Sequence, residues 1–234
     1  MSTLRLRLAG PLQAWGASSR FVRRATEHAP TKSGVIGMLA AARGLRRTDE
    51  LTDFFGLRFG VRVDQPGRLV RDFQAARSLG GAHAYPLSYR YYLADAVFLA
   101  VVEGDDQLLR GLDEAVRDPH YPLYLGRRSC PPAGPVSLGV SDGTLADALN
   151  HTEWLASPWY QRRSATSTVT LTVVRDMAPG EEGRQVETIR DEPLSFDPQR
   201  REYGWRTVVR QQVTVRNPNP PKVPDHEPFA AIGG

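Results

Sequence analysis

Leu4-Arg-Leu-Arg-Leu8 is a stretch in which apolar and charged residues alternate strictly. A period of two predicts a β-strand over residues 3–9, with its leucines facing a core and its arginines facing away from it. Gly10-Pro11 follows directly and ends the strand. The elements that come next along the chain decide what kind of sheet this strand joins.

A helix, further strands and a second helix are predicted after this strand. Apolar residues at helical spacing indicate the first helix, and Thr31 or Ser33 is available as its N-cap. In order, the predicted elements are a helix at 33–45, strands at 57–63, 68–74 and 91–102, and an amphipathic helix at 105–116. This order opens a βαββαβ unit, so we predict an α+β, ferredoxin-like fold.

The segment 76–89 interrupts this pattern in the middle of the predicted unit. It is rich in Gly, Ala and Ser and includes Gly80-Gly81 and Pro86, which makes it too polar and too broken for a core element. We therefore expect a projecting loop or hairpin, at about 70–91 with its flanks, in the central hairpin of the ferredoxin-like unit, and we refer to this segment as the thumb.

The C-terminal half has weaker patterns. Short strand candidates lie at 136–140, 168–175, 186–190 and 205–213. The expected parts are a first domain at 1–140, a smaller β-rich part at 141–216, and a tail at 217–234 that carries five prolines and is predicted to be extended or disordered.

The composition suits a single folded core with a basic surface. The 234 residues include 28 arginines and two lysines, with a formal net charge of +4. Guanidinium groups bind phosphate and stack on bases, which favours RNA, but a GC-rich genome would produce the same arginine bias. One cysteine, Cys130, and scattered histidines predict neither a disulfide nor a metal or other cofactor. The lack of a signal peptide or a long apolar run predicts a cytoplasmic protein.

Hydrogen-bond donors and aromatic rings gather between Gly10 and Gly34. A helix start, a lysine and hydroxyl groups can hold a phosphate, while an aromatic ring can stack on an unpaired base. The candidate RNA-binding residues here are Gln13, Trp15, Arg20, Phe21, Arg24, Thr31, Lys32 and Ser33. In the alternative interpretation, Trp15 anchors the loop in the core and Thr31 is only a helix cap. The spacing does not match a nucleotide-binding P-loop.

Two further segments combine arginine with turn-forming or aromatic residues. The loop at 126–131 offers Arg127, Arg128 and Ser129 to phosphates, although the two arginines could also simply face solvent or acidic side chains. The stretch entering the thumb offers Arg71, Phe73, Gln74 and Arg77, followed by several tyrosines. Of these tyrosines, Tyr92 is expected to pack under a sheet. No histidine neighbours Cys130 in the sequence, which argues against a nucleophilic role.

These segments, in this order, resemble the CasD family, the fifth Cas proteins of type I-E CRISPR systems, which belong to the RAMP superfamily. The resemblance is good over residues 3–140 and loose beyond them. The stretches that carry it are Leu8-Ala-Gly-Pro-Leu-Gln-Ala-Trp-Gly16, Pro30-Thr-Lys-Ser-Gly-Val-Ile-Gly37, Arg71-Asp-Phe73, Tyr92-Leu-Ala-Asp-Ala-Val-Phe98 and Tyr124-Leu-Gly-Arg-Arg-Ser-Cys-Pro131.

The resemblance implies a RAMP (RRM-like) domain with a thumb, and a function in antiviral defence within the Cascade complex. It implies binding of the 5′ handle of the crRNA, contacts with the backbone subunit CasC and the large PAM-reading subunit CasA, and indirect contact with other Cascade subunits and target DNA. No membrane partner is implied. One departure is the thumb, which looks short and carries few charges.

Catalysis is not expected. In type I-C systems a relative cleaves precursor crRNA, whereas in type I-E systems a separate endonuclease, CasE, does so. Metal-independent RNA cleavage needs a general base beside a 2′-hydroxyl and a cation for the phosphate, and no motif supplies this set. The alternative function is an endoribonuclease that uses His28 or His83 with a tyrosine. A third possibility is a protein scaffold without RNA contact.

Overall fold

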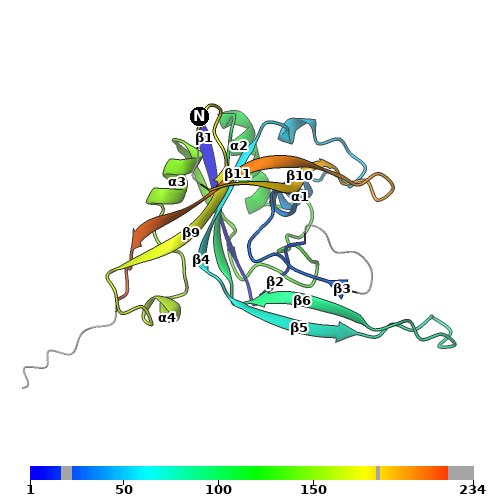
Figure 1. Cartoon of the computed structure of the whole chain (residues 1–234). Helices are drawn as coiled ribbons and strands as arrows, with labels where there is room; N and C mark the ends of the chain where they lie inside the picture. The colour runs from blue at the N-terminus through cyan, green and yellow to red at the C-terminus, as the bar shows by residue number, and fades with distance from the viewer. Residues whose placement is uncertain (17–22, 183–184, 221–234) are drawn as a thin grey trace, which may run out of the picture.

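Seven strands form the main antiparallel sheet, in the order β10-β11-β9-β4-β7-β1-β8 (Figure 1). The computed structural model describes residues 1–16, 23–182 and 185–220. The strands of this sheet are β1 (Ser2–Ala9), β4 (Arg58–Gln65), β7 (Val97–Gly104), β8 (Ser137–Asp142), β9 (Thr168–Asp176), β10 (Val186–Ser195) and β11 (Glu202–Arg216). A smaller sheet contains β2 (Leu12–Gln13), β3 (Arg23–Arg24), β5 (Arg68–Gln74) and β6 (Ser88–Ala94).

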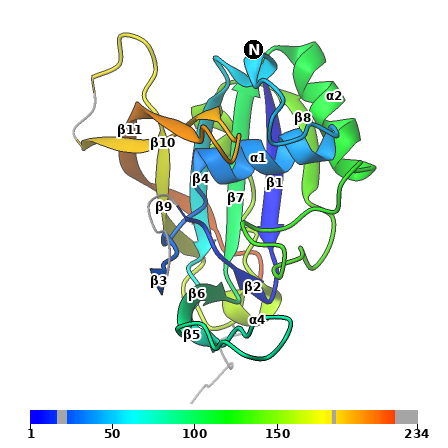
Figure 2. The same ribbon diagram turned by 90° about the vertical axis from the view of Figure 1, so that its right-hand side faces the viewer.

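Helices cover both faces of the main sheet. The helical elements are α1 (Lys32–Ala42), the 3-10 helix η1 (Thr52–Phe54), α2 (Asp106–Arg117), α3 (Leu145–His151) and α4 (Pro158–Gln161). Figure 2 shows α1 and α2 in front of β4, β7 and β1. On this side Leu4, Leu6 and Leu8 are completely buried, as the alternation in β1 predicts. On the other face α3 packs its leucines against β7 and β9.

Two glycines let α1 lie close to its neighbours. The hydroxyl of Thr31, the N-cap residue, accepts the Gly34 N–H at 3.2 Å. A Cβ at Gly34 would lie 2.9 Å from the Trp15 ring, and one at Gly37 would lie 3.3 Å from the Phe196 ring. The helix therefore sits tightly between the loop after β1 and the hairpin of β10 and β11.

The predicted order of elements is confirmed for the N-terminal half. The chain runs β1, α1, β4, β7, α2, β8, and the β5–β6 hairpin is inserted between β4 and β7. Its strands pair antiparallel from Arg68↔Ala94 to Gln74↔Ser88. This hairpin projects away from the main sheet at the place where a thumb was expected (Figure 1).

The prediction of a single strand over 91–102 is wrong. The structure divides this stretch into β6 and β7, because Asp95 adopts a positive φ of 56° and turns the chain between the two sheets. The Asp95 N–H donates to the Pro11 carbonyl at 3.2 Å. Short, polar aspartate tolerates this left-handed conformation better than most residues.

The C-terminal strands continue the main sheet. Gly60–Arg62 of β4 pair with Val173–Arg175 of β9, so β9, β11 and β10 extend the sheet that β1 begins. Helices α3 and α4 were not predicted. At the start of the expected tail, the Asn217 side chain is buried and donates to the carbonyls of Gln161, Ser164 and Thr166. The remainder of that tail, 221–234, lies outside the described residues.

Candidate functional site

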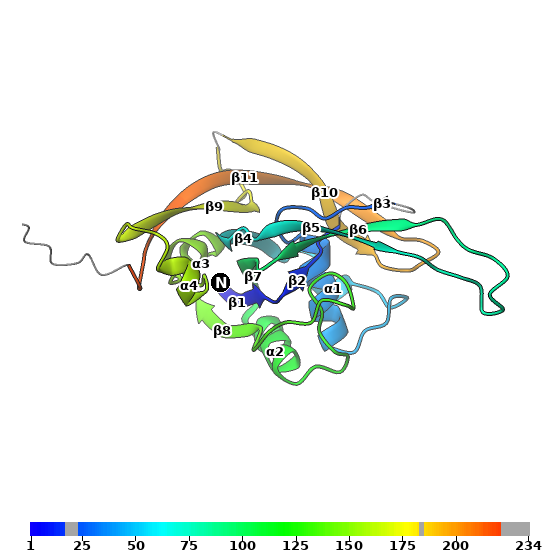
Figure 3. The same ribbon diagram turned by 90° about the horizontal axis from the view of Figure 1, so that it is seen from below.

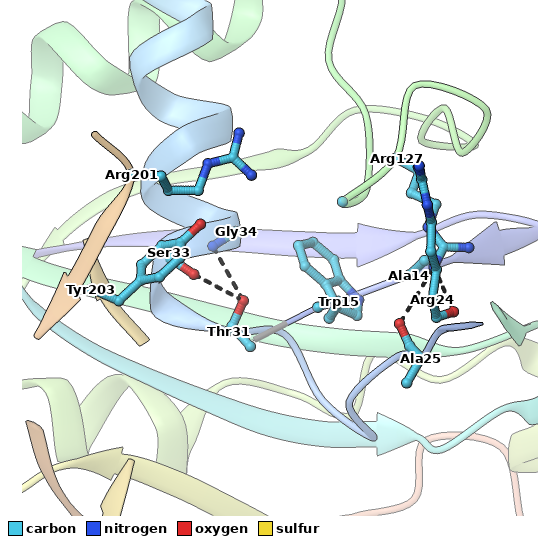
Figure 4. A pocket seen from close by; sticks show the side chains of 12 residues that line it. Ala14, Trp15, Arg24, Ala25, Thr31, Ser33, Gly34, Arg127, Arg201 and Tyr203 are labelled. Atoms are coloured by element: carbon cyan, nitrogen blue, oxygen red, sulfur yellow. Dashed lines mark hydrogen bonds between the residues drawn. The ribbon is translucent and has the colours of Figure 1, made fainter. Parts of the chain in front are cut away.

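A pocket of about 440 Å³ opens beside the N-terminus of α1. Figure 4 shows Arg201 and Tyr203 on one side of it, Arg24 and Arg127 on the other, and Trp15 between them. The pocket thus joins the loop after β1, the start of α1, the loop at 126–127 and the β10–β11 hairpin.

Two of the pocket's arginines carry free charge. Arg24 and Arg201 are exposed, and within the described part of the chain neither guanidinium has an ion-pair or hydrogen-bond partner. The described residues that line the pocket include no acidic side chain. The pocket is therefore positively charged and suited to a phosphate-bearing ligand.

Arg127 builds the wall of the pocket. Its guanidinium donates to the Tyr91 carbonyl at 3.2 Å and to the Arg24 carbonyl at 2.9 Å, and lies 4.8 Å from the centre of the Tyr92 ring. The preceding residue, Gly126, has a φ of 84°, and a Cβ there would lie 1.8 Å from the Ala14 carbonyl oxygen. Arg127 therefore ties three segments together while its charge remains at the pocket.

The rest of this loop was expected to bind phosphate as well. Arg128 and Ser129 are exposed beside the pocket without lining it. Cys130 is buried, and burial raises the pKa of its thiol. A buried thiol with a raised pKa is a poor nucleophile, which agrees with the sequence argument against catalysis by this residue.

Lys32 does not face the pocket, contrary to the expectation. Its side chain is buried, with Nζ 2.6 Å from the Glu192 carboxylate and 3.3 Å from that of Asp176. Two carboxylates already neutralise this ammonium group. Lys32 is therefore removed from the set of phosphate contacts.

The free N–H groups expected at the start of α1 are also occupied. The Lys32 N–H donates to the Asp191 carboxylate at 2.8 Å, and Thr31 caps the next turn. Arg206 binds the same Asp191 carboxylate at 2.5 Å and that of Asp176 at 2.6 Å. Burial acts to lower the pKa of Arg206, but the bonds to the two carboxylates outweigh it and raise the pKa. The anion at this helix terminus is thus supplied by the chain itself.

Trp15 anchors the loop, as the alternative interpretation proposed, and Gln13, expected to bind RNA, anchors it as well. Both side chains are completely buried. Trp15 donates from Nε1 to the Gln13 side chain at 3.0 Å, and Gln13 donates to the carbonyls of Leu8 and Ala96. A fully buried ring offers no face to a base. Thr31 and Ser33, each about 6% exposed, similarly reach the pocket only at its floor.

A second hollow of about 180 Å³ adjoins the first along α1. The two share Ser33, Gly34, Gly126, Arg201 and Tyr203 in their linings. At its far end stand Arg46 and Arg47, both exposed and without a side-chain partner in the described parts of the chain.

Sequence reasoning missed the contribution of β11 and of the loop before it. Arg201 and Tyr203 lie more than 160 residues after Ser33 in the sequence, between the strand candidates at 186–190 and 205–213. The pairing of an arginine with a nearby tyrosine, as in the thumb, was the one available signal. Arg46 and Arg47 were likewise missed, because two arginines at a helix end are common on any protein surface.

Comparison with known proteins identifies the family. The family model described as CRISPR-associated protein (Cas_Cas5) matches residues 3–209. The chain belongs to the Cas5 family. It is similar to the Escherichia coli K12 protein named CRISPR system Cascade subunit CasD, with 35% identity over an alignment of 188 residues, and the match covers 70% of this chain and 83% of the relative.

Two solved structures share the fold of this Cas5 protein. A chain from a structure described as a CRISPR RNA-guided surveillance complex superposes with a TM-score of 0.74 at 30% identity, covering 96% of this chain and 95% of the other. A second, described as a crystal structure of a Cas protein, gives a TM-score of 0.70 at 36% identity, covering 95% and 99%. The family resemblance read from the sequence is confirmed.

The candidate residues of the thumb lie apart from the pocket. Arg71, Phe73, Gln74 and Arg77 are all exposed on the β5–β6 hairpin and line neither hollow. Phe73 is 65% exposed, and the Arg71 guanidinium lies 5.5 Å from the centre of the Tyr89 ring. Arg20 and Phe21 lie outside the described residues. This Cas5 chain therefore presents two separate candidate surfaces, the arginine-lined pocket and the thumb.

The pocket holds little that could catalyse a proton transfer. Among the described residues, the linings of both hollows contain no histidine, lysine, cysteine, aspartate or glutamate. His28 and His83 are exposed elsewhere. Within residues 1–16, 23–182 and 185–220, no cluster of acidic, histidine and cysteine side chains is placed to hold a metal ion. Over the same ranges, no helix is long and apolar enough to cross a membrane.

Proposed function

We propose that this Cas5 protein is a non-catalytic subunit of a type I-E CRISPR surveillance complex, Cascade, in which it holds the 5′ handle of the crRNA. The observation that carries the proposal is the pocket beside α1 with two unpaired arginines, in a member of a family whose E. coli relative is named a Cascade subunit. The antiparallel α+β architecture with an inserted hairpin supports a ferredoxin-like fold of the RAMP type.

Each group in the pocket has a definite role in this proposal. Arg24 and Arg201 bind phosphates on opposite sides of the opening. Tyr203, half-buried on the same side as Arg201, offers its ring to an unpaired base, because stacking is a main contact that proteins make with single-stranded RNA. Arg128 and Ser129 extend the phosphate contacts beyond the pocket.

The thumb supports assembly with other subunits. All seven residues of β5 are exposed, including apolar Leu69, Val70 and Phe73. A two-stranded hairpin with such a surface is marginally stable in water, so we propose that the guide RNA and the backbone subunit CasC cover it in the complex. Arg71 and Arg77 would then contact RNA phosphates, and Phe73 and Gln74 its bases. Contact with CasA, and indirect contact with other subunits and target DNA, completes the proposed cytoplasmic assembly.

Binding without cleavage follows from the chemistry of the lining. Cleavage at a 2′-hydroxyl needs a group that accepts its proton, and the described lining offers only arginine, tyrosine and hydroxyl side chains. The endoribonuclease alternative is tested with purified protein and repeat RNA in EDTA. A defined cut that is lost in His28→Ala or His83→Ala would replace the present proposal.

The proposed phosphate contacts are tested by the salt dependence of RNA binding. The logarithm of the RNA-binding constant falls with the logarithm of the salt concentration, and each phosphate contact on a single strand contributes about −0.7 to that slope. Arg24→Ala with Arg201→Ala should therefore make the slope shallower by about 1.4. The matched control is Arg110→Ala with Arg117→Ala, two exposed arginines on α2. Equal slopes for wild type and both double variants, measured with a 5′-handle oligonucleotide, would contradict the proposal.

A further inference from the structure

A cleft of about 780 Å³ lies between the end of β4, helix α4 and the first half of β9. Figures 1 and 3 show α4 close to the beginning of β9, on the side of the molecule away from the thumb tip. The cleft shares no lining residue with the two hollows along α1. Nothing in the proposed RNA-binding function uses it.

One wall of this cleft is an open strand edge. β4 pairs with β9 only where Gly60–Arg62 meet Val173–Arg175, whereas β9 pairs with β11 along its whole length from Thr168 to Asp176. Over 168–172 the other edge of β9 therefore has no partner strand among the described residues. Alternate residues of an antiparallel strand direct their N–H and C=O groups toward each edge. The Thr168 carbonyl already accepts from the Thr166 hydroxyl at 2.6 Å, so the backbone donors and acceptors available to another strand lie over 169–172.

The opposite wall is the end of β4, where Asp64 and Gln65 already have hydrogen-bond partners. The Asp64 carbonyl of β4 accepts from Trp154 Nε1 at 2.8 Å, and the Gln65 side chain accepts from the Ser157 N–H at 3.1 Å. The segment after α3 thus occupies the end of β4, which leaves β9 as the edge available to another strand.

Two aromatic residues, Trp154 and Tyr160, line the cleft, and Trp159 contacts Tyr160 beside it without being part of the lining. Tyr160 packs edge-on against Trp154 and Trp159, with ring centres 6.0 and 5.6 Å apart. Trp159 remains 46% exposed. Tryptophan, tyrosine and arginine are the residues that most often dominate binding energy at protein interfaces.

The free charge of the cleft is positive. Arg163, which lines it, and Arg162 beside it are exposed and have no side-chain partner in the described part of the chain. The acidic residue in the lining, Asp64, is buried and forms a 2.7 Å ion pair with Arg62. An occupant that carries a carboxylate near Arg163 would complement this surface.

We propose that an extended, acidic segment of a neighbouring protein subunit adds as a strand to the open edge of β9 in this cleft. A peptide strand matches alternating backbone donors and acceptors, which an RNA strand does not, and this mode of recognition is common at free sheet edges. The inference rests on the proposed membership in a multi-subunit complex, and it assigns the cleft to a protein and the α1 pocket to RNA.

Site-specific photo-crosslinking in the assembled, guide-loaded complex tests this assignment. The photoreactive residue p-benzoylphenylalanine replaces Trp159, and in a matched control it replaces Phe55, which directly follows η1 and is 51% exposed. We expect position 159 to crosslink a protein subunit, at an extended segment that contains Asp or Glu. Position 55 should not label that segment. Adding Arg163→Glu to the first variant should reduce the crosslink about tenfold, with Arg163→Gln giving a smaller reduction.

Three results would overturn the proposal. Labelling from position 159 no stronger than from position 55 would show that the cleft is empty. A crosslink to RNA would assign it to nucleic acid, and a protein crosslink that is insensitive to Arg163→Glu would reject an acidic occupant. Guide RNA is quantified in the same samples, so a complex that retains its guide but lacks the crosslink separates failure of this inference from failure of the proposed function.

Discussion

Two hairpins leave the body of this protein on the same side, and they differ in how they are held (Figures 1 and 3). β10 and β11 are fastened to α1 by buried ion pairs among Lys32, Asp176, Asp191, Glu192 and Arg206. Among the described residues, β5 and β6 form no such network, and every residue of β5 is exposed.

This difference indicates that the β10–β11 hairpin is a fixed wall of a binding site, whereas the thumb is a surface that partners cover on assembly. The fixed hairpin places Arg201 and Tyr203 against the start of α1, where their positions are set before any ligand binds. The thumb leaves apolar side chains in water, so its contacts are expected to form on assembly. Each of the following variants acts on one side of this comparison.

The largest effect is expected for Lys32→Met. Removing one member of a buried ionic network leaves Glu192 and Asp176 short of positive charge, which should lower the free energy of unfolding by roughly 3–5 kcal/mol. Arg43→Met is the control, because the exposed Arg43–Asp53 pair should contribute at most about 1 kcal/mol. Equal losses of unfolding free energy for both variants, measured by urea unfolding, would contradict the claim that the buried ion pairs hold the β10–β11 hairpin against α1.

A smaller loss is expected where the thumb joins the body. Arg127→Ala removes bonds to the carbonyls of Tyr91 and Arg24, and should cost about 1–3 kcal/mol. Arg128→Ala, next to it and exposed, should leave stability within about 0.5 kcal/mol and weaken RNA binding alone. The comparison needs thermal unfolding and RNA binding on both proteins. A reversal of the two results would exchange the roles assigned to the adjacent arginines.

The exposed apolar side chains of β5 should hardly affect the stability of the isolated chain. Leu69→Ser with Phe73→Ser changes residues that are 56% and 65% exposed, so unfolding should shift by no more than about 0.5 kcal/mol. Recovery of the chain with guide RNA and the other subunits should nevertheless fall. Normal assembly of this double variant would show that the exposed apolar side chains are not covered in the complex.

A pH-dependent effect on stability is expected from the loop between β9 and β10. A bidentate hydrogen bond from Arg175 lowers the pKa of Glu181 from its ordinary 4.5 to about 2. Because the folded-state pKa is depressed, this carboxylate stabilises the fold above about pH 4.5, and the contribution disappears as the pH falls toward 2. Glu181→Gln should remove about 1 kcal/mol or less at pH 7 and flatten the acid limb of stability, whereas Glu182→Gln should leave both unchanged.

The sequence predicted those elements of the fold that depend on neighbouring residues alone. The alternation in β1 follows from side-chain direction alone, and the cap at Thr31 depends on residues within one turn. The break at Asp95 was missed, because a left-handed residue inside an apolar run shows no periodicity. Residues 97–102 were correctly predicted as a strand, but residues 91–94 of the same predicted strand belong to the smaller sheet.

The site was harder to predict, because its charges are decided by distant partners. Lys32 looked free in the sequence, yet its carboxylates come from residues 176 and 192. Trp15 looked suited to stacking on a base, but the absence of a side chain at Gly34 leaves room for its ring to pack against the start of α1. Arg201 reaches the pocket only through the long pairing of β10 with β11. Residue type therefore indicated the chemistry, and tertiary contacts decided which residues perform it.

Zero-length ultraviolet crosslinking of guide RNA in the assembled complex, read out by residue, tests the central claim most directly. We expect a crosslink at Tyr203, adjacent to Arg201 in the pocket, on crRNA that stays intact through purification. Loss of that crosslink in Arg24→Ala with Arg201→Ala would show that these two arginines hold the guide RNA in the pocket. A guide-loaded complex without a crosslink in or beside the α1 pocket, or a guide cut by the isolated chain, would contradict it.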